Sequence, residues 1–325
     1  MEIKIFDLDE TGSFKLYCRL FSKRSLRISP PTPAILYVPG GGFTTCEPED
    51  QEEMLLRFMG CGYQTFTFTY PVGENYRFPD VIIQLSKALK MIRSHAEEWN
   101  IDPHRIAVGG CSAGAHISGA LSVLWNRPMI QEPAGCSGTE NCPDVMLLCY
   151  GPMYCNQLTA DGLLYVPTGD LIGPHTPPTF ISHCGDDDLV PVDQTLAYAV
   201  SLRKAGVPMS VFISSNGGHG GLQNFENKAS MEGQLLTTID EWFGSFLKFA
   251  DNSCGVSPDP VRQAPMGPPE EARPAQLREG ADTAPPAMPP LPVLNADGNQ
   301  MGSFAADLKL CFDGGADESF DHVLV

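Results

Sequence analysis

A serine stands between two glycines in the stretch Gly110-Cys111-Ser112-Ala113-Gly114. The apolar run at 106–108 predicts a strand buried on both faces, and the small residues from Ala113 onward predict a packed helix. A serine at the apex of such a strand-to-helix turn has strained backbone angles, so the residues two positions away must be very small. The pattern predicts a nucleophilic serine whose hydroxyl projects above a sheet.

Two side chains in this stretch, those of Cys111 and Ser112, could act as a nucleophile. Cys111 has an alanine, not a glycine, two residues ahead, so the turn suits Ser112 better. Ser112 is therefore the predicted nucleophile. The amide of Ala113, at the start of the predicted helix, is a predicted donor to an oxyanion.

Three consecutive glycines follow another predicted strand, at 34–38, in Pro39-Gly40-Gly41-Gly42-Phe43. Glycine lets the backbone turn its amides outward with little steric hindrance, which is what an oxyanion hole requires. We therefore expect the amide of Gly41 or Gly42 to complete an oxyanion hole with that of Ala113.

A serine nucleophile needs a base within hydrogen-bond reach and a carboxylate that orients the base. Where the serine lies on such an elbow, the acid and then the histidine follow it in the chain, each after a strand. His219 lies in a glycine-flanked loop after the last predicted strand and is the predicted base. Of the others, His175 leaves poor candidates for an intervening acid, His183 lies inside an apolar strand and His322 lies far downstream.

Three adjacent aspartates, at 186–188, follow the strand predicted at 179–184. Three neighbouring carboxylates are costly unless some face water, so we expect at most one to point into the site. Asp187 is the predicted acid, but the residues alone leave Asp186 nearly as good a candidate. The remaining aspartates would be solvated or would cap the next helix.

Strand and helix patterns alternate around these motifs. An antiparallel edge pair is predicted at 2–8 and 14–21, followed by strands at 34–38, 63–70, 106–108, 145–150, 179–184 and 209–213. Helices are predicted at 48–58, 80–99, from 113 onward, at 192–205 and at 230–249. A turn is expected at Asp102-Pro103, a loop around Cys136 and Cys142, and irregular chain up to Pro178 that could cover the site. This order indicates an α/β fold with a mostly parallel sheet, helices on both faces and antiparallel N-terminal edge strands.

The chain of 325 residues, 42% of them hydrophobic, suits one large α/β domain with appendages. We expect this domain to occupy residues 1–250. Residues 251–298 contain 11 of the 29 prolines and little aliphatic periodicity, which predicts a disordered linker. Residues 299–325 would form an acidic C-terminal tail.

Charge and cysteine usage exclude several classes of partner. The net charge of −18, from 39 acidic and 21 basic residues, argues against nucleic acid or an anionic membrane surface. The 11 cysteines lack C-x-x-C spacing, which argues against zinc and favours small buried hydrophobes. The start of the sequence shows no apolar signal segment and no run approaches the length of a membrane span, so we expect a cytoplasmic protein.

With these motifs in this order, the chain resembles the α/β-hydrolase esterases, in particular the acetylxylan-esterase-like and feruloyl-esterase-like group. The resemblance covers about residues 1–250 and includes the Pro-Gly-Gly-Gly-aromatic motif at 39–43. In that group the acid lies four residues before the proline of a D-x-x-V-P pattern, which falls on Asp187. The chain departs from the group at Ala115, where glycine is usual, and in the short segment 156–178, which bears on the substrate pocket.

The resemblance implies a serine carboxylic-ester hydrolase that works through Ser112, Asp187 and His219 by way of an acyl-enzyme. Its substrates would be acetyl or other short acyl esters of small molecules or carbohydrates, and no metal or organic cofactor is implied. An amide-type hydrolase, such as a peptidase or an arylformamidase, would use the same three groups. A catalytically idle binding or scaffold protein is another alternative, which the acidic tail favours and the complete set of three groups argues against.

Overall fold

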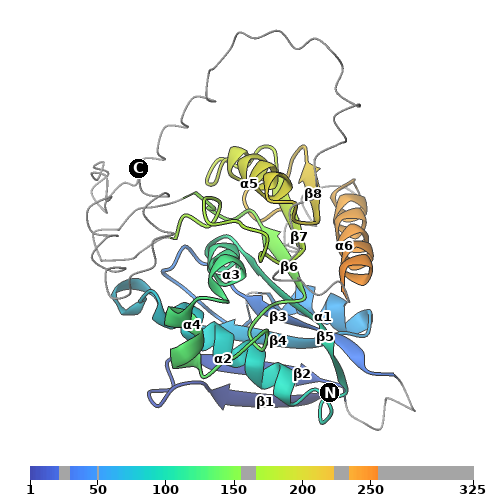
Figure 1. The fold of residues 1–325 in the computed structure, drawn as a ribbon. Helices are drawn as coiled ribbons and strands as arrows, with labels where there is room; N and C mark the ends of the chain where they lie inside the picture. Colours follow the sequence, from blue (N-terminus) through green and yellow to red (C-terminus); the bar gives the residue numbers. More distant parts are fainter. Residues whose placement is uncertain (22–29, 50, 155–165, 223–233, 255–325) are drawn as a thin grey trace, which may run out of the picture.

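A single sheet carries the fold. The computed structural model describes residues 1–21, 30–49, 51–154, 166–222 and 234–254. Within these ranges eight strands pair in the order β1-β2-β4-β3-β5-β6-β7-β8 (Figure 1). The strands are β1 (Glu2–Asp7), β2 (Lys15–Leu20), β3 (Thr32–Val38), β4 (Gln64–Thr69), β5 (Ile101–Cys111), β6 (Val145–Cys149), β7 (Thr179–Cys184) and β8 (Met209–Ser214).

The direction of the strands follows the prediction. β1 pairs with β2 and β2 with β4 in antiparallel fashion, whereas all pairings from β4 to β8 are parallel. All residues of β4, β6 and β7 are buried, as is typical of parallel strands covered on both faces. The predicted α/β fold with antiparallel N-terminal edge strands is confirmed.

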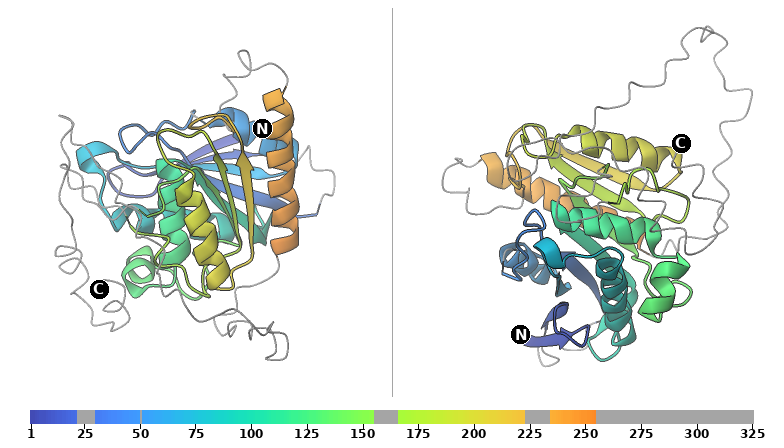
Figure 2. Two further views of the ribbon diagram at one scale, coloured as in Figure 1. Left: turned by 90° about the horizontal axis from the view of Figure 1, so that it is seen from above. Right: turned by 90° about the vertical axis from the view of Figure 1, so that its left-hand side faces the viewer.

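Helices cover both faces of the sheet (Figure 2). One side carries α2 (Asp80–Ser94), α3 (Ala113–Leu124), α4 (Pro128–Ala134) and α5 (Asp193–Lys204), and the other carries α1 (Glu52–Gly60) and α6 (Gln234–Ser253). Because side chains alternate along a strand, neighbouring residues feed two separate cores. Leu36 of β3 lies in the core beneath α3, and the adjacent Ile35 lies in the core beneath α6.

The ends of α1 and α2 differ from those predicted. α1 begins at Glu52 instead of residue 48, and its first turn holds two glutamates, which a helix N-terminus favours. α2 ends at Ser94 instead of residue 99, because the Ile101 amide donates to the Ala96 carbonyl at 2.7 Å and turns the chain into β5. The apolar residues after Ser94 are core residues of this turn, as shown by Trp99, whose ring lies 5.5 Å from that of Phe66.

One other expectation was wrong, and one helix was not predicted. β5 begins at Ile101, so the turn expected at Asp102-Pro103 lies inside the strand, where its pairing with β3 shifts register between Thr32 and Ala34. The helix not predicted is α4, which comes before the loop with Cys136 and Cys142; that loop is present as expected. The first residue of α4 is Pro128, a position where the missing N–H costs nothing, and the helix is followed by Gly135, whose φ of 63° ends it.

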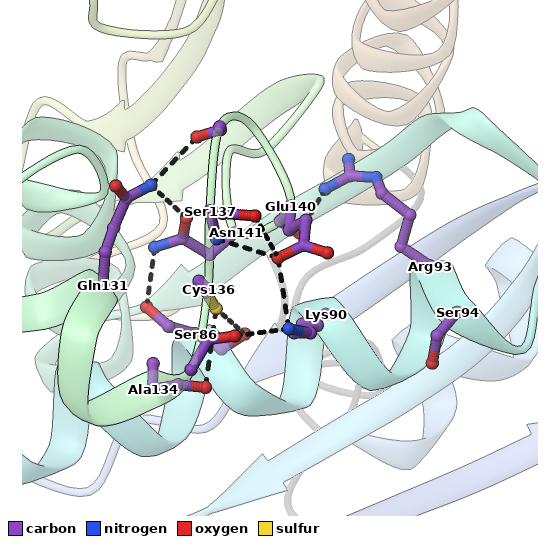
Figure 3. A network of polar contacts seen from close by, with 12 residues as sticks. Ser86, Lys90, Arg93, Ser94, Gln131, Ala134, Cys136, Ser137, Glu140 and Asn141 are labelled. Carbon is purple, nitrogen blue, oxygen red and sulfur yellow. Dashed lines mark hydrogen bonds and ion pairs between the residues drawn. The ribbon is translucent and has the colours of Figure 1, made fainter.

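Polar contacts fasten the chain after α4 to α2 (Figure 3). Lys90 of α2 lies 3.1 Å from the Glu140 carboxylate. The Asn141 amide donates to Ser86 Oγ at 3.2 Å, and Gln131 of α4 donates to Asn141 at 3.1 Å. Arg93 reaches the Asp144 carboxylate at 3.0 Å, just before β6 begins. These contacts hold the connection that brings the chain back to the sheet beside β5.

The predicted C-terminal segments lie mostly outside the described residues. α6 runs to Ser253, slightly past the expected domain end at residue 250. The expected linker from residue 255 onward and the tail at 299–325 are not among the described ranges, and neither is 155–165 of the expected cover. None of the helices within those ranges is long and apolar enough to cross a membrane.

Candidate active site

Ser112 occupies a strained turn between β5 and α3. Its backbone has φ 51° and ψ −120°, and a positive φ is rare for a residue with a side chain. A Cβ at Gly114 would overlap the carbonyl oxygens of Val38 and Pro39, and a Cβ at Gly110 would overlap the backbone of Gly114. The two glycines are therefore required by space on both sides of the serine, as the sequence pattern predicts.

Three predicted residues from distant parts of the chain meet at this turn. His219 Nε2 lies 3.0 Å from Ser112 Oγ, and His219 Nδ1 lies 2.8 Å from Asp187 Oδ2. The side chain of Asp187 is fully buried, whereas the imidazole of His219 is 22% exposed. Each residue follows the carboxyl end of a parallel strand, β5, β7 or β8, so the sheet brings all three to the same edge.

The carboxylate of Asp187 is held on both oxygens. Oδ1 accepts the amides of Leu189 at 3.0 Å and Val190 at 2.9 Å. Oδ2 faces His219 and also lies 3.1 Å from Nε2 of His183. A buried carboxylate held at four points on its two oxygens cannot rotate freely.

Asp186 contacts backbone amides and not the imidazole of His219. Its exposed carboxylate accepts the amide of Gly218 at 2.8 Å and that of Gly217 at 3.1 Å. These bonds, chiefly the one from Gly218, lower the pKa of Asp186 from its ordinary value. Asp186 thus fixes the loop that carries His219, while Asp187 contacts the imidazole itself.

Tyr150 is a neighbour that the sequence analysis missed. Its ring meets the imidazole of His219 edge to face, with centroids 4.8 Å apart and planes at 77°. It directly follows β6 and has φ 41°, a rare conformation for a residue with a side chain. The position could have been noticed because it ends a central strand at the same edge as the other three residues.

The glycine loop after β3 lies against the elbow. A Cβ at Gly40 would lie 3.3 Å from Ser112 Cβ, which shows how closely the two backbones approach. The carbonyl of Gly41 accepts the amides of Thr44 at 2.9 Å and Thr45 at 3.1 Å. Because the carbonyl and the next N–H of a trans peptide point in opposite directions, the amide of Gly42 faces away from this turn.

His116 anchors one wall beside the elbow. Its Nδ1 lies 2.7 Å from the carbonyl of Pro152, and its Nε2 accepts the amide of Val166 at 3.0 Å. The two partners require a neutral ring with the proton on Nδ1. Burial lowers the pKa of His116 to about 4. Phe43 packs against this ring and against Tyr76, with centroid distances of 6.0 and 5.1 Å.

The chain is similar to known proteins in sequence and in fold. A family model described as BD-FAE matches residues 25–149, which include the glycine loop and the elbow. The chain is 26% identical to an acetylxylan esterase of Xylanibacter ruminicola over 261 residues, which are 74% of this chain and 50% of that protein. It is 28% identical to endo-1,4-beta-xylanase B of Butyrivibrio fibrisolvens over 205 residues, 57% of this chain and 32% of that protein.

The chain therefore spans half or less of the length of these two relatives. Among solved structures, the carboxylesterase Cest-2923 from Lactobacillus plantarum superposes with a TM-score of 0.66 at 20% identity, covering 78% of this chain and 98% of that one. At this identity the likeness concerns the fold. The chain therefore has the fold of the α/β hydrolases, and its relatives include esterases.

Proposed function

We propose that the chain hydrolyses carboxylic esters, with Ser112 as nucleophile, His219 as general base and Asp187 as the acid that orients the base. The observation that carries this proposal is the continuous chain of contacts from Ser112 Oγ through both nitrogens of His219 to Asp187 Oδ2, at 3.0 and 2.8 Å. Both distances are within the range for hydrogen bonds at which a base can take a proton from a hydroxyl. The strained backbone at Ser112 supports the proposal, because strain of this kind is concentrated at functional sites.

In the first half of the reaction, Ser112 Oγ attacks the ester carbonyl carbon while its proton passes to His219 Nε2. The imidazolium that forms is stabilised by the negative charge of Asp187, which also keeps the other ring proton on Nδ1. When the tetrahedral intermediate collapses, the C–O bond to the alcohol breaks and the proton on Nε2 passes to the leaving oxygen. The products of this half are the alcohol and an acyl-enzyme at Ser112.

The negative charge on the intermediate needs preorganised donors. The amide of Ala113 is the first in α3, and the first N–H groups of a helix have no partner inside the helix. On the glycine loop the orientation of the Gly41 carbonyl favours the amide of Gly42 as the second donor. One such donor is typically worth about 3 kcal/mol in the transition state.

The second half repeats the chemistry with water. His219 Nε2 removes a proton from a water molecule, whose oxygen attacks the acyl carbonyl, and the same proton then returns to Ser112 Oγ as the acid departs. The 22% exposure of the His219 side chain supports this step, because the ring is open to solvent. No residue beyond those already named is needed to balance the protons.

We propose short acyl esters as the substrate class, including acetyl groups on carbohydrates. The acetylxylan esterase and the xylanase among the relatives support a carbohydrate alcohol. The rings of Phe43 and Tyr76, beside the glycine loop, support an apolar wall next to the reacting carbonyl.

The test compares Ser112→Ala with Cys111→Ala. Both variants and the unmodified chain are assayed on p-nitrophenyl acetate, on acetylated xylo-oligosaccharides, and on anilide and formanilide substrates, and are labelled with a fluorophosphonate. We expect hydrolysis of the esters and labelling to vanish in Ser112→Ala and to persist in Cys111→Ala, whose thiol is buried toward α6. Faster turnover of the amide-type substrates than of every ester would replace the proposal with an amide hydrolase. The absence of any serine-dependent turnover would reject a hydrolytic function.

A further inference from the structure

His183 contacts the same carboxylate oxygen as His219, Oδ2 of Asp187. It is the last residue but one of β7, and its side chain has no exposed surface. Nothing in the reaction proposed above uses this histidine. A fully buried imidazole within 3.1 Å of Asp187 Oδ2 therefore calls for an explanation.

The neighbours of His183 define its protonation. Nε2 lies 2.8 Å from the carbonyl of Val190 and 3.1 Å from the carboxylate of Asp187, and both of these groups only accept hydrogen bonds. Nε2 must therefore carry a proton. Nδ1 lies 2.8 Å from the hydroxyl of Thr195, which can donate to it. The arrangement fits a neutral ring with the proton on Nε2.

The neutral state of the His183 ring affects how the negative charge of Asp187 is used. Burial lowers the pKa of His183 from its ordinary value, although the Val190 carbonyl and Asp187 act in the opposite direction. A second cation beside Asp187 would compete with the imidazolium that forms at His219 for the same negative charge. A neutral donor orients the carboxylate and leaves that charge available.

We propose that His183 is a positioning residue: its Nε2–H, set by Thr195 and Val190, holds Asp187 Oδ2 toward His219. The inference rests on the proposed roles of Asp187 and His219. Oδ1 is already fixed by two backbone amides, so the bond from His183 determines where the remaining lone pair of Oδ2 points. Thr195, in the first turn of α5 and fully buried, links this helix to the site.

The first experiment reads the protonation directly in the full chain. Nitrogen-15 NMR of histidine-labelled protein at neutral pH is expected to show His183 with a protonated Nε2 and an unprotonated Nδ1. The downfield proton on Nδ1 of His219 is expected to be present in the unmodified chain and in His183→Gln, whose amide places a donor near Nε2, and lost in His183→Leu. A His183 ring protonated on Nδ1 or on both nitrogens overturns the proposal, as does an unchanged His219 proton in His183→Leu.

The second experiment separates positioning from packing. On p-nitrophenyl acetate we expect His183→Leu to lower kcat on the order of tenfold to a hundredfold with little change in KM, because a hydrogen bond to a charged group is lost. His183→Gln is expected to recover most of that loss. Equal losses in both variants, or unchanged kcat in His183→Leu, overturn the proposal. Thr195→Val, with Thr195→Ser as its matched control, decides the question if His183→Leu does not fold. The valine variant removes the hydroxyl that holds Nδ1, so only it should lower kcat and weaken the downfield proton of His219, and equal behaviour of the two variants overturns the proposal.

The two proposals fail in different ways. If the unmodified chain shows no Ser112-dependent hydrolysis, the proposed function fails, and the NMR comparison alone decides whether His183 positions Asp187. If hydrolysis is present and the His219 proton does not respond to residue 183, the function stands and the inference about His183 falls.

Discussion

Exchanging Asp187 for asparagine tests the assignment of the acid more sharply than deleting it, because the shape of the side chain is kept. The carboxylate faces four donors: two amides on Oδ1 and two imidazole nitrogens on Oδ2. An asparagine offers one oxygen and one NH₂ group. Whichever way it is turned, the NH₂ group meets two N–H donors, so a buried arrangement of donor against donor is unavoidable.

The less disruptive placement keeps the oxygen on the amides of Leu189 and Val190 and turns the NH₂ group toward His219. His219 then has to present a bare Nδ1, which moves its proton to Nε2 and removes the lone pair that should accept the proton of Ser112. The same change of tautomer in a serine triad lowers kcat on the order of 10⁴-fold, or about 5 kcal/mol in activation free energy. We expect a loss of this size for Asp187→Asn.

Asp186→Asn is the matched control. This exposed side chain keeps one oxygen for the amides of Gly217 and Gly218 and loses the other, so we expect less than about a tenfold decrease in kcat. Initial rates on p-nitrophenyl acetate, with circular dichroism to verify folding, measure both variants. An intolerant residue 186 beside a tolerant residue 187 would refute the reasoning and transfer the acid to Asp186.

Three further predictions concern stability and the extent of the catalytic unit. Gly114→Ala should lower the free energy of unfolding by about 1–3 kcal/mol, because its Cβ would overlap the Val38 and Pro39 carbonyls. Gly244→Ala in α6, where a Cβ meets open space, should raise the free energy of unfolding by about 0.5–1 kcal/mol. Urea titrations that give the reverse order of stability would contradict this. The pKa of His116 is lowered to about 4, so between about pH 4 and 6.5 the unfolded chain binds more protons than the folded chain. Stability that is present above this window is lost as the pH falls, and His116 should account for a loss of about 2 kcal/mol in the free energy of unfolding between pH 7.5 and 5. An identical loss in His116→Gln would show that other groups are responsible. Removal of residues 255–325 should leave kcat and KM for p-nitrophenyl acetate unchanged, since every group of the proposed mechanism precedes residue 222; a severalfold change in KM would assign the extension a role at the site.

Sequence patterns located the parts of the site that depend on local backbone constraints. The elbow could be predicted because a serine with a positive φ imposes small neighbours, and Gly110 and Gly114 satisfy this in the sequence itself. His219 followed from the order of strands, which fixes the edge at which each loop emerges. The strand at 179–184 was predicted with its observed bounds because it is short, apolar and bounded by Pro178 and Gly185.

Other features depend on contacts that a linear pattern does not contain. Asp186 and Asp187 are adjacent and chemically identical, so the sequence alone does not distinguish them. The turn after β7 directs Asp186 to the loop amides and Asp187 to the imidazole of His219. His183 was dismissed because it lies in an apolar strand. Its position, four residues before Asp187, was the signal that could have drawn attention to it. The end of α2 was misplaced because apolar residues continue past the helix into a turn that is also buried.

The contact between the elbow and the glycine loop has a consequence for directed evolution. Gly114 packs against the carbonyls of Val38 and Pro39, and Gly40 approaches Ser112 Cβ, so the two segments touch through their main chains. Main-chain atoms have no rotamers, so they cannot move aside to make room for a new side chain. A library that randomises positions 40, 110 or 114 would therefore consist mainly of destabilised members. Position 44 is a better site for randomisation, because Thr44 has an exposed side chain and lies in the loop that begins at Gly40.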